Sequence, residues 1–173
     1  MLNIFINTWG NYNENGADGG EWVTLPMDSD ELEERMEAIA EQMHDDDPEF
    51  FINDYEWTTG IEPRAIDEME NIMDLNEFIN ELDGLQEYEQ KEIAAAIEAF
   101  GYDFEEAMDK QQRGCFTFYE GMDLEEVAEE LVNECYFTKD APDIFTRYFD
   151  YEAFVRDLGY DGYCETEYGV IIE

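Results

Sequence analysis

The sequence predicts a mixed α+β protein, built as an elongated chain of three small subdomains. Two patterns predict this fold class. Short stretches with an apolar residue at every second position, typical of half-buried strands, occur toward both ends of the chain. Stretches with apolar residues three and four positions apart, typical of amphipathic helices, fill the middle. We therefore expect an N-terminal α+β subdomain at 1–60, a helical subdomain at 61–112 and a C-terminal α+β subdomain at 113–173.

The first subdomain is expected to be a ββαβ-like unit. Residues 2–8 alternate, and 21–26 and 50–57 form the next two predicted strands. The Asn- and Gly-rich stretch 11–20 predicts a loop. Asp28 or Ser29 can cap a helix that runs to about His44, where Asp45-Asp46-Asp47-Pro48 ends it. Its apolar positions recur at helical spacing: Leu32, Met36, Ile39 and Met43.

Four short helices are predicted in the middle. Pro63 can open the first, which carries Ile66 and Met69. The second has an apolar stripe ended by Gly84, the third covers 88–100 and the fourth covers 104–110. The stripe of the second consists of Leu75, Phe78, Ile79 and Leu82. Helices this short are only marginally stable in isolation, so they must pack on other elements.

The last third returns to mixed structure. A strand is predicted at 115–119, and Asp123 caps a helix over 123–136. Short helices are expected at 142–148 and 151–158. A hairpin of strands 163–166 and 170–172, turning about 167–169, ends the chain. The apolar side of the 123–136 helix carries Leu124, Val127, Leu131 and Cys135.

Charge is the feature that most restricts function. The 173 residues include 48 Asp and Glu against 8 Lys and Arg, giving a net charge of −40. Such a chain cannot bind nucleic acid through its phosphates, which requires clustered Lys and Arg, and it is repelled by anionic membranes. We therefore expect neither a nucleic-acid nor a membrane partner.

No constellation of residues indicates catalysis. The only histidine, His44, forms an ExxH pair with Glu41, but di-iron sites need two such pairs. GxSxG, Walker A and GxGxxG motifs are absent, and the three cysteines are not spaced as a zinc site or a disulfide framework. We expect a protein that is not an enzyme and uses no cofactor or metal. With no signal peptide at its N-terminus, it is expected to be cytoplasmic.

The arrangement of the carboxylates favours DNA mimicry. Acidic residues three and four apart on a helix lie ~5–6 Å apart, which approaches the phosphate spacing of DNA. Forty charges correspond to the charge of roughly twenty base pairs, at one charge per ~1.7 Å of duplex. A solvated surface that ensures solubility, or adaptation to high salt, also explains acidity, but neither readily explains 15% aromatic content. The predicted DNA-mimic residues are Asp30, Glu33, Glu34, Glu37, Glu41, Glu125, Glu126, Glu129, Glu130, Asp150, Glu152 and Asp157.

Several segments, in order, resemble the ArdA antirestriction family. YFDYEAFVRDL at 148–158 resembles its antirestriction segment, preceded by DLEEVAEELVNE at 123–134 and followed by GYCETEYGVIIE at 162–173. NTWGNYNENG at 7–16, EWVTLPMD at 21–28 and FINDYE at 51–56 are similar to the family's opening strands and loop. The resemblance covers nearly the whole chain and is weakest in the helical middle.

The resemblance implies a DNA mimic encoded on a mobile genetic element. It implies a homodimer formed through the C-terminal domain, which binds type I restriction–modification enzymes in place of DNA and inhibits them. Because strongly charged chains can associate only where local charge is low, we expect the dimer contact at Phe116, Phe118, Val170 and Ile172. Two alternatives stay open: an inhibitor of another DNA-binding machine, such as a CRISPR effector, and a salt-adapted acidic cation-binding module.

Overall fold

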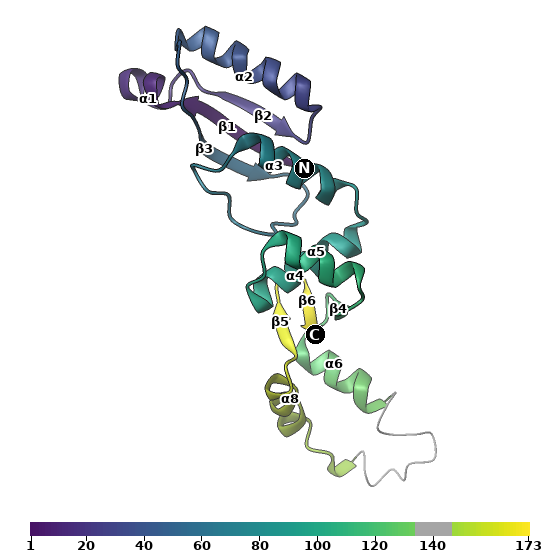
Figure 1. The fold of residues 1–173 in the computed structure, drawn as a ribbon. Helices are drawn as coiled ribbons and strands as arrows, with labels where there is room; N and C mark the ends of the chain where they lie inside the picture. The colour runs from purple at the N-terminus through teal and green to yellow at the C-terminus, as the bar shows by residue number, and fades with distance from the viewer. Residues whose placement is uncertain (134–146) are drawn as a thin grey trace. The chain divides into compact units, whose positions relative to one another are not determined.

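A computed structural model describes residues 1–133 and 147–173, which form seven helices and two three-stranded antiparallel sheets (Figure 1). The predicted α+β class is confirmed. The chain divides into two compact units, Met1–Gln86 and Glu87–Glu173. Each unit contains one sheet, and the helices predicted for the middle are shared between them. The three-subdomain division stays a prediction. The end of the predicted 123–136 helix, with Cys135, and most of the 142–148 helix lie outside the described residues.

The sheet of the first unit has strand β1 (Leu2–Thr8) at its centre, between β2 (Glu21–Leu25) and β3 (Phe50–Trp57). All three predicted strands are confirmed. Leu2, Ile4 and Ile6 are fully buried on one face, and Ile4 lies opposite Val23 of β2. The opposite face carries Asn3 and Phe5, which are only half-buried. This alternation is expected of an antiparallel sheet with one face on the core.

Helix α2 (Ser29–Met43) contacts β1 and packs against helix α3 (Ile72–Asp83), which itself contacts β2. Both predicted helices are confirmed. The Asp28 carboxylate caps α2 by accepting a hydrogen bond from the Asp30 amide at 3.0 Å. Leu32 and Ile39 are buried, so the helix turns its acidic positions to solvent. It ends at His44, whose left-handed φ of 56° stops the helix before the Asp-rich turn.

A short helix, α1 (Trp9–Asn15), replaces the first part of the loop predicted at 11–20, so that prediction is wrong there. The hydroxyl of Thr8 caps the helix by accepting from the Asn11 amide at 3.2 Å. The Asn11 side chain donates to Asn7 Oδ1 at 2.9 Å, and the Trp9 ring stacks on Phe51 with centroids 4.2 Å apart. These contacts overcome the poor helix propensity of Asn and Gly.

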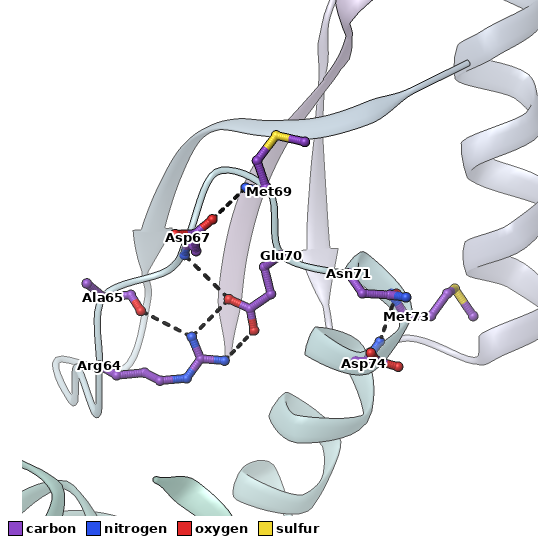
Figure 2. Close-up of polar contacts among 8 residues, drawn as sticks. All are labelled: Arg64, Ala65, Asp67, Met69, Glu70, Asn71, Met73 and Asp74. Carbon is purple, nitrogen blue, oxygen red and sulfur yellow. Dashed lines mark hydrogen bonds and ion pairs between the residues drawn. The ribbon is translucent and has the colours of Figure 1, made fainter. Parts of the chain in front are cut away.

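The segment after Pro63 forms no helix, which corrects the helix predicted to carry Ile66 and Met69. Figure 2 shows the contacts that this segment makes instead: the Arg64 guanidinium binds the Glu70 carboxylate with both terminal nitrogens and also donates to the Ala65 carbonyl at 3.1 Å. The Asp67 carboxylate accepts from the Met69 amide at 2.8 Å. Side-chain bonds of this kind offer the backbone an alternative to helical bonding. The segment instead runs beside β3, where the Ile52 amide donates to the Glu68 carbonyl.

In the second unit, α4 (Glu87–Phe100) contacts all three strands of a sheet ordered β4–β6–β5. The predicted third and fourth helices, the 115–119 strand, the Asp123-capped helix, the 151–158 helix and the hairpin are confirmed within the described residues. The remaining elements are α5 (Phe104–Gln112), β4 (Thr117–Glu120), α6 (Leu124–Leu131), α8 (Tyr151–Tyr160), β5 (Cys164–Thr166) and β6 (Gly169–Ile172).

Candidate functional site: acidic faces of α2, α6 and α8

The solvent-facing side of α2 carries a row of carboxylates. Glu33, Glu37 and Glu41 follow one another at intervals of four residues, so they lie on one face of the helix, each ~6 Å further along its axis. All three are exposed, and none makes an ion pair within the described residues. Asp30 and Glu34, the other predicted positions on this helix, are exposed as well. The row therefore presents unneutralised negative charge at nearly regular intervals.

An open groove of about 730 Å³ lies beside this row. Its acidic lining consists of Glu33, Glu37, Glu41, Asp45 and Asp46. Sequence reasoning assigned the two aspartates only to the end of the helix. No local pattern could show that the chain turn brings them to the same groove as the glutamates.

A second acidic groove, of about 390 Å³, lies between α6 and α8, which pack on each other. It brings three predicted residues together: Glu125 and Glu129 from α6, and Glu152 from α8. Tyr151 and Val155 complete the lining. The first turn of α8 and the first two turns of α6 thus contribute carboxylates to one surface, although some twenty residues separate the two helices in the chain.

The other predicted acidic positions of this unit have additional contacts. Glu126 forms a capping box with Asp123, since each carboxylate accepts from the other residue's amide, at 3.1 and 2.8 Å. Asp150 caps α8 by accepting from the Ala153 amide at 3.0 Å. Asp157 pairs with Arg156 at 3.2 Å, and Glu130 is half-buried. Glu126 and Asp150 therefore fix the ends of the helices that carry the groove carboxylates.

The positive side chains are largely neutralised inside the chain. In the part of the chain that the structure describes, six of them make ion pairs with carboxylates: Arg35, Arg64, Lys91, Lys110, Arg113 and Arg156. Lys91 bridges Glu87 and Glu120, with both distances 2.7 Å. Its hydrogen bond and positive charge lower the pKa of the Glu87 carboxyl. Because the cations are engaged in this way, they do little to shield the acidic faces of α2 and α6.

One carboxyl group is buried away from these surfaces. Glu92 of α4 is 8% exposed, and burial raises its pKa above the ordinary value. The hydrogen bond from Gln111 Nε2, 3.1 Å long, opposes the rise, while the negative charge of Glu89 adds to it. A raised carboxyl pKa is one mark of a catalytic acid, but this group is enclosed by α4 and α5 and opens to no groove identified in the described residues.

The structure places the predicted dimer residues mostly inside the second unit. Val170 is fully buried in the central strand β6, and Phe118 is 8% exposed, with its ring 5.5 Å from that of Tyr88. Phe116 and Ile172 are half-buried. Only the last two thus keep apolar surface that a second chain can contact. The homodimer itself stays a prediction.

Glu41 and His44, the ExxH pair, both line the groove beside α2. Among the residues that the structure describes, no three His, Cys, Asp or Glu side chains are grouped as a metal site. None of the helices in 1–133 and 147–173 combines the length and the apolar character needed to cross a membrane.

The family model of the antirestriction protein ArdA matches residues 4–172, which is nearly the whole chain. The chain belongs to the ArdA family. The match spans both compact units, so the grooves beside α2 and between α6 and α8 both lie within the matched residues. The sequence matches no curated protein. The resemblance noted in the sequence is therefore confirmed, and antirestriction is the function that the family implies.

Proposed function

We propose that this ArdA-family chain is a DNA mimic that occupies the DNA-binding groove of a type I restriction–modification enzyme and blocks it. The observation that carries the proposal is the row of exposed carboxylates Glu33, Glu37 and Glu41, which form no ion pair with any described residue, on a helix that is capped and packed on a sheet. The α6–α8 groove supplies a second acidic surface of the same kind.

Rigidity is the physical requirement for such a mimic. A flexible acidic tail loses conformational entropy when it binds, whereas carboxylates on packed helices are already placed. The caps at Asp28, Asp123 and Asp150 hold the helix ends, and the buried stripe of α2 holds that helix against β1. The mutual repulsion of the carboxylates is then offset by the cores beneath them rather than relieved by local unfolding.

The mechanism requires no bond to be made or broken. Lys and Arg side chains of the enzyme's groove would bind the carboxylates in place of phosphates, and counterions would be released as they are when DNA binds. Inhibition is then competitive with DNA and stoichiometric, and the chain is not an enzyme. The same contacts are weakened by salt, because the Debye length falls to ~8 Å at physiological ionic strength.

The test is a competition between this protein and a labelled duplex for a purified type I enzyme. We expect the duplex to be displaced as the protein approaches the concentration of DNA-binding sites, and additional duplex to restore binding. An acidic protein of unrelated fold and similar net charge is the control, and it should displace far less. Loss of restriction without any loss of DNA binding, or inhibition at a small fraction of the enzyme concentration, would contradict the proposal.

A further inference from the structure

The groove beside α2 has an apolar floor, which phosphate mimicry does not require. Its lining includes Met36 and Ala40 from α2, Pro48 and Phe50 from the approach to β3, and Met73 from α3. In Figure 2, the Met73 side chain points away from the Arg64–Glu70 pair. At about 730 Å³, the groove falls within the usual size range of ligand pockets. Carboxylates therefore stand along an apolar surface that comes from three separate chain segments.

The acidic and apolar parts of the lining together indicate which kind of ligand fits the groove. The carboxylates favour cations, and no described Lys or Arg side chain lines the groove. Within Met1–Gln86 the only Lys or Arg side chains are Arg35 and Arg64, and each is paired with a glutamate. The two methionines can adapt to varied apolar shapes. A ligand that presents Lys or Arg beside leucine-like side chains satisfies both parts of the lining, whereas a purely cationic ligand leaves the floor exposed to water.

We infer that this groove docks a basic amphipathic helix of the inhibited enzyme. Glu33, Glu37 and Glu41 span two turns of α2, and Lys or Arg residues four positions apart on a partner helix have the same spacing. The apolar face of such a helix would contact Met36, Phe50 and Met73, a helix-in-groove mode of recognition. A second copy of this chain is disfavoured as the occupant because it would bring a further −40 charge to an acidic groove.

The inference rests on the proposed function but goes beyond it. Copying DNA needs only charges at phosphate spacing, and duplex DNA presents no such apolar groove beside its phosphates. A docked helix adds contacts that DNA does not make with the same enzyme. Part of the affinity should then persist at salt concentrations that remove most of the electrostatic attraction, because apolar burial is not screened by salt.

The probes are two synthetic peptides with the same Lys, Leu and Ala content. One places its leucines on one helical face, and the other scatters them, so the two differ only in amphipathic order. Binding to the full chain is measured by fluorescence anisotropy at physiological salt. We expect the ordered peptide to bind about tenfold tighter, as the burial of one leucine side chain would provide. Equal binding of both peptides would mean that charge alone attracts them, and it would overturn the inference.

Matched variants locate the site. Met36→Lys places a cation on the groove floor, whereas Ala38→Lys makes the same charge change at an exposed position of the same helix outside the groove. Met36→Lys should abolish the preference for the ordered peptide, and Ala38→Lys should keep it. Met73→Lys, with exposed Met69→Lys as its control, repeats the test from α3 if Met36→Lys unfolds the chain. A preference that survives both groove substitutions overturns the inference.

The same variants separate this inference from DNA mimicry. In the enzyme competition, Met36→Lys should raise the concentration needed to displace DNA by about tenfold more than Ala38→Lys. An equal effect of the two variants, with displacement otherwise intact, would overturn the docked helix and leave DNA mimicry standing. If the wild-type chain fails to displace DNA at all, the proposed function fails, while the peptide measurements still decide what the groove binds.

Discussion

The Asn76 side chain of α3 binds both backbone polar groups of Met27. The Met27 amide donates to Asn76 Oδ1, and Asn76 Nδ2 donates to the Met27 carbonyl, each at 2.9 Å. Asn76 is only 3% exposed. This pair of bonds holds the chain just before α2 against α3, so it fixes one side of the groove that Met36 and Met73 line.

Replacing Asn76 should therefore destabilise the first unit. In Asn76→Ala, both Met27 groups lose their partner, and a buried polar group without a partner costs ~1–3 kcal/mol. We expect a loss of that order in the free energy of unfolding, measured by urea denaturation. Exposed Asn80→Ala, on the same helix, is the control and should change stability little. A stability equal to that of the wild-type chain would show that water replaces both bonds.

Burial of Glu92 should make stability depend on pH. Its pKa is raised chiefly by burial, so the folded chain holds this proton more tightly than the unfolded chain does. The bound proton of Glu92 contributes to the free energy of unfolding. This contribution is complete at pH values below the pKa of Glu92 in the unfolded chain, and it is lost as the pH rises through the raised pKa of Glu92 in the folded chain. Glu92→Gln should therefore raise the free energy of unfolding at neutral pH and flatten its fall with pH. The substituted amide can still accept the bond from Gln111.

The matched control for Glu92 is Glu105→Gln, an exposed position on α5. It removes one carboxylate from the same unit without removing a buried charge. Urea denaturation at several pH values between acid and neutral compares the two variants. Identical pH profiles would mean that Glu92 contributes no more than an average surface carboxylate.

Salt should stabilise the whole protein. With a net charge of −40, the folded chain repels itself, and added salt shortens the range of that repulsion. We expect the melting temperature to rise between low ionic strength and about 0.5 M NaCl, where the Debye length is below ~8 Å. Six of the seven ion pairs among the described residues have at least one side chain more than a third exposed, so their screening should offset little of the gain. A melting temperature that does not change with salt would contradict this expectation.

The regular elements could be predicted because their patterns are local. The alternation of Leu2, Ile4 and Ile6, and the spacing of Leu75, Phe78 and Leu82, are properties of single segments, and the buried faces follow from them. Helix α1 could not be predicted in this way. The Thr8 cap and the Asn7–Asn11 bond are local, but the stacking of Trp9 on Phe51 joins residues about forty positions apart, and no local pattern in the sequence shows that contact.

The candidate site was predictable in its charges and not in its shape. The exposed row of α2 follows from helical spacing alone. The groove floor does not, because Met36, Phe50 and Met73 are brought together only by the packing of α2, β3 and α3. The spacing of Ile66 and Met69 predicted a helix that does not form. The segment instead contains the Arg64–Glu70 ion pair, and residues six positions apart do not lie on the same face of a helix.

A homodimer of the 20.3 kDa chain should be detected by light scattering at physiological salt. Strand β6 is the central strand of its sheet, so both of its edges are already paired and it cannot pair with a strand of a second chain. Association is therefore expected at the apolar surface that remains at Phe116 and Ile172. Ile172→Asp should shift the protein toward monomer, since it adds charge where two acidic chains meet. Ala17→Asp, exposed in the first unit, makes the same charge change and should not. A wild-type chain that is monomeric at every concentration would contradict the dimer.

Inhibition should be distributed over many carboxylates, because a DNA-binding groove contacts many phosphates and each contact contributes a modest, salt-screened increment. Glutamine substitutions at Glu125, Glu126 and Glu129 test this in the second unit, and a glutamine side chain in the Glu126→Gln variant can still complete the capping box. Each added substitution should weaken displacement of DNA by a similar step and reduce its salt dependence. A catalytic acid or base behaves differently, since its loss typically lowers the reaction rate ~100-fold or more.

Asp157→Asn, which removes a carboxylate already paired with Arg156, is the control and should change displacement least. One substitution that abolishes inhibition while the fold persists would point to a discrete site instead of a distributed mimic.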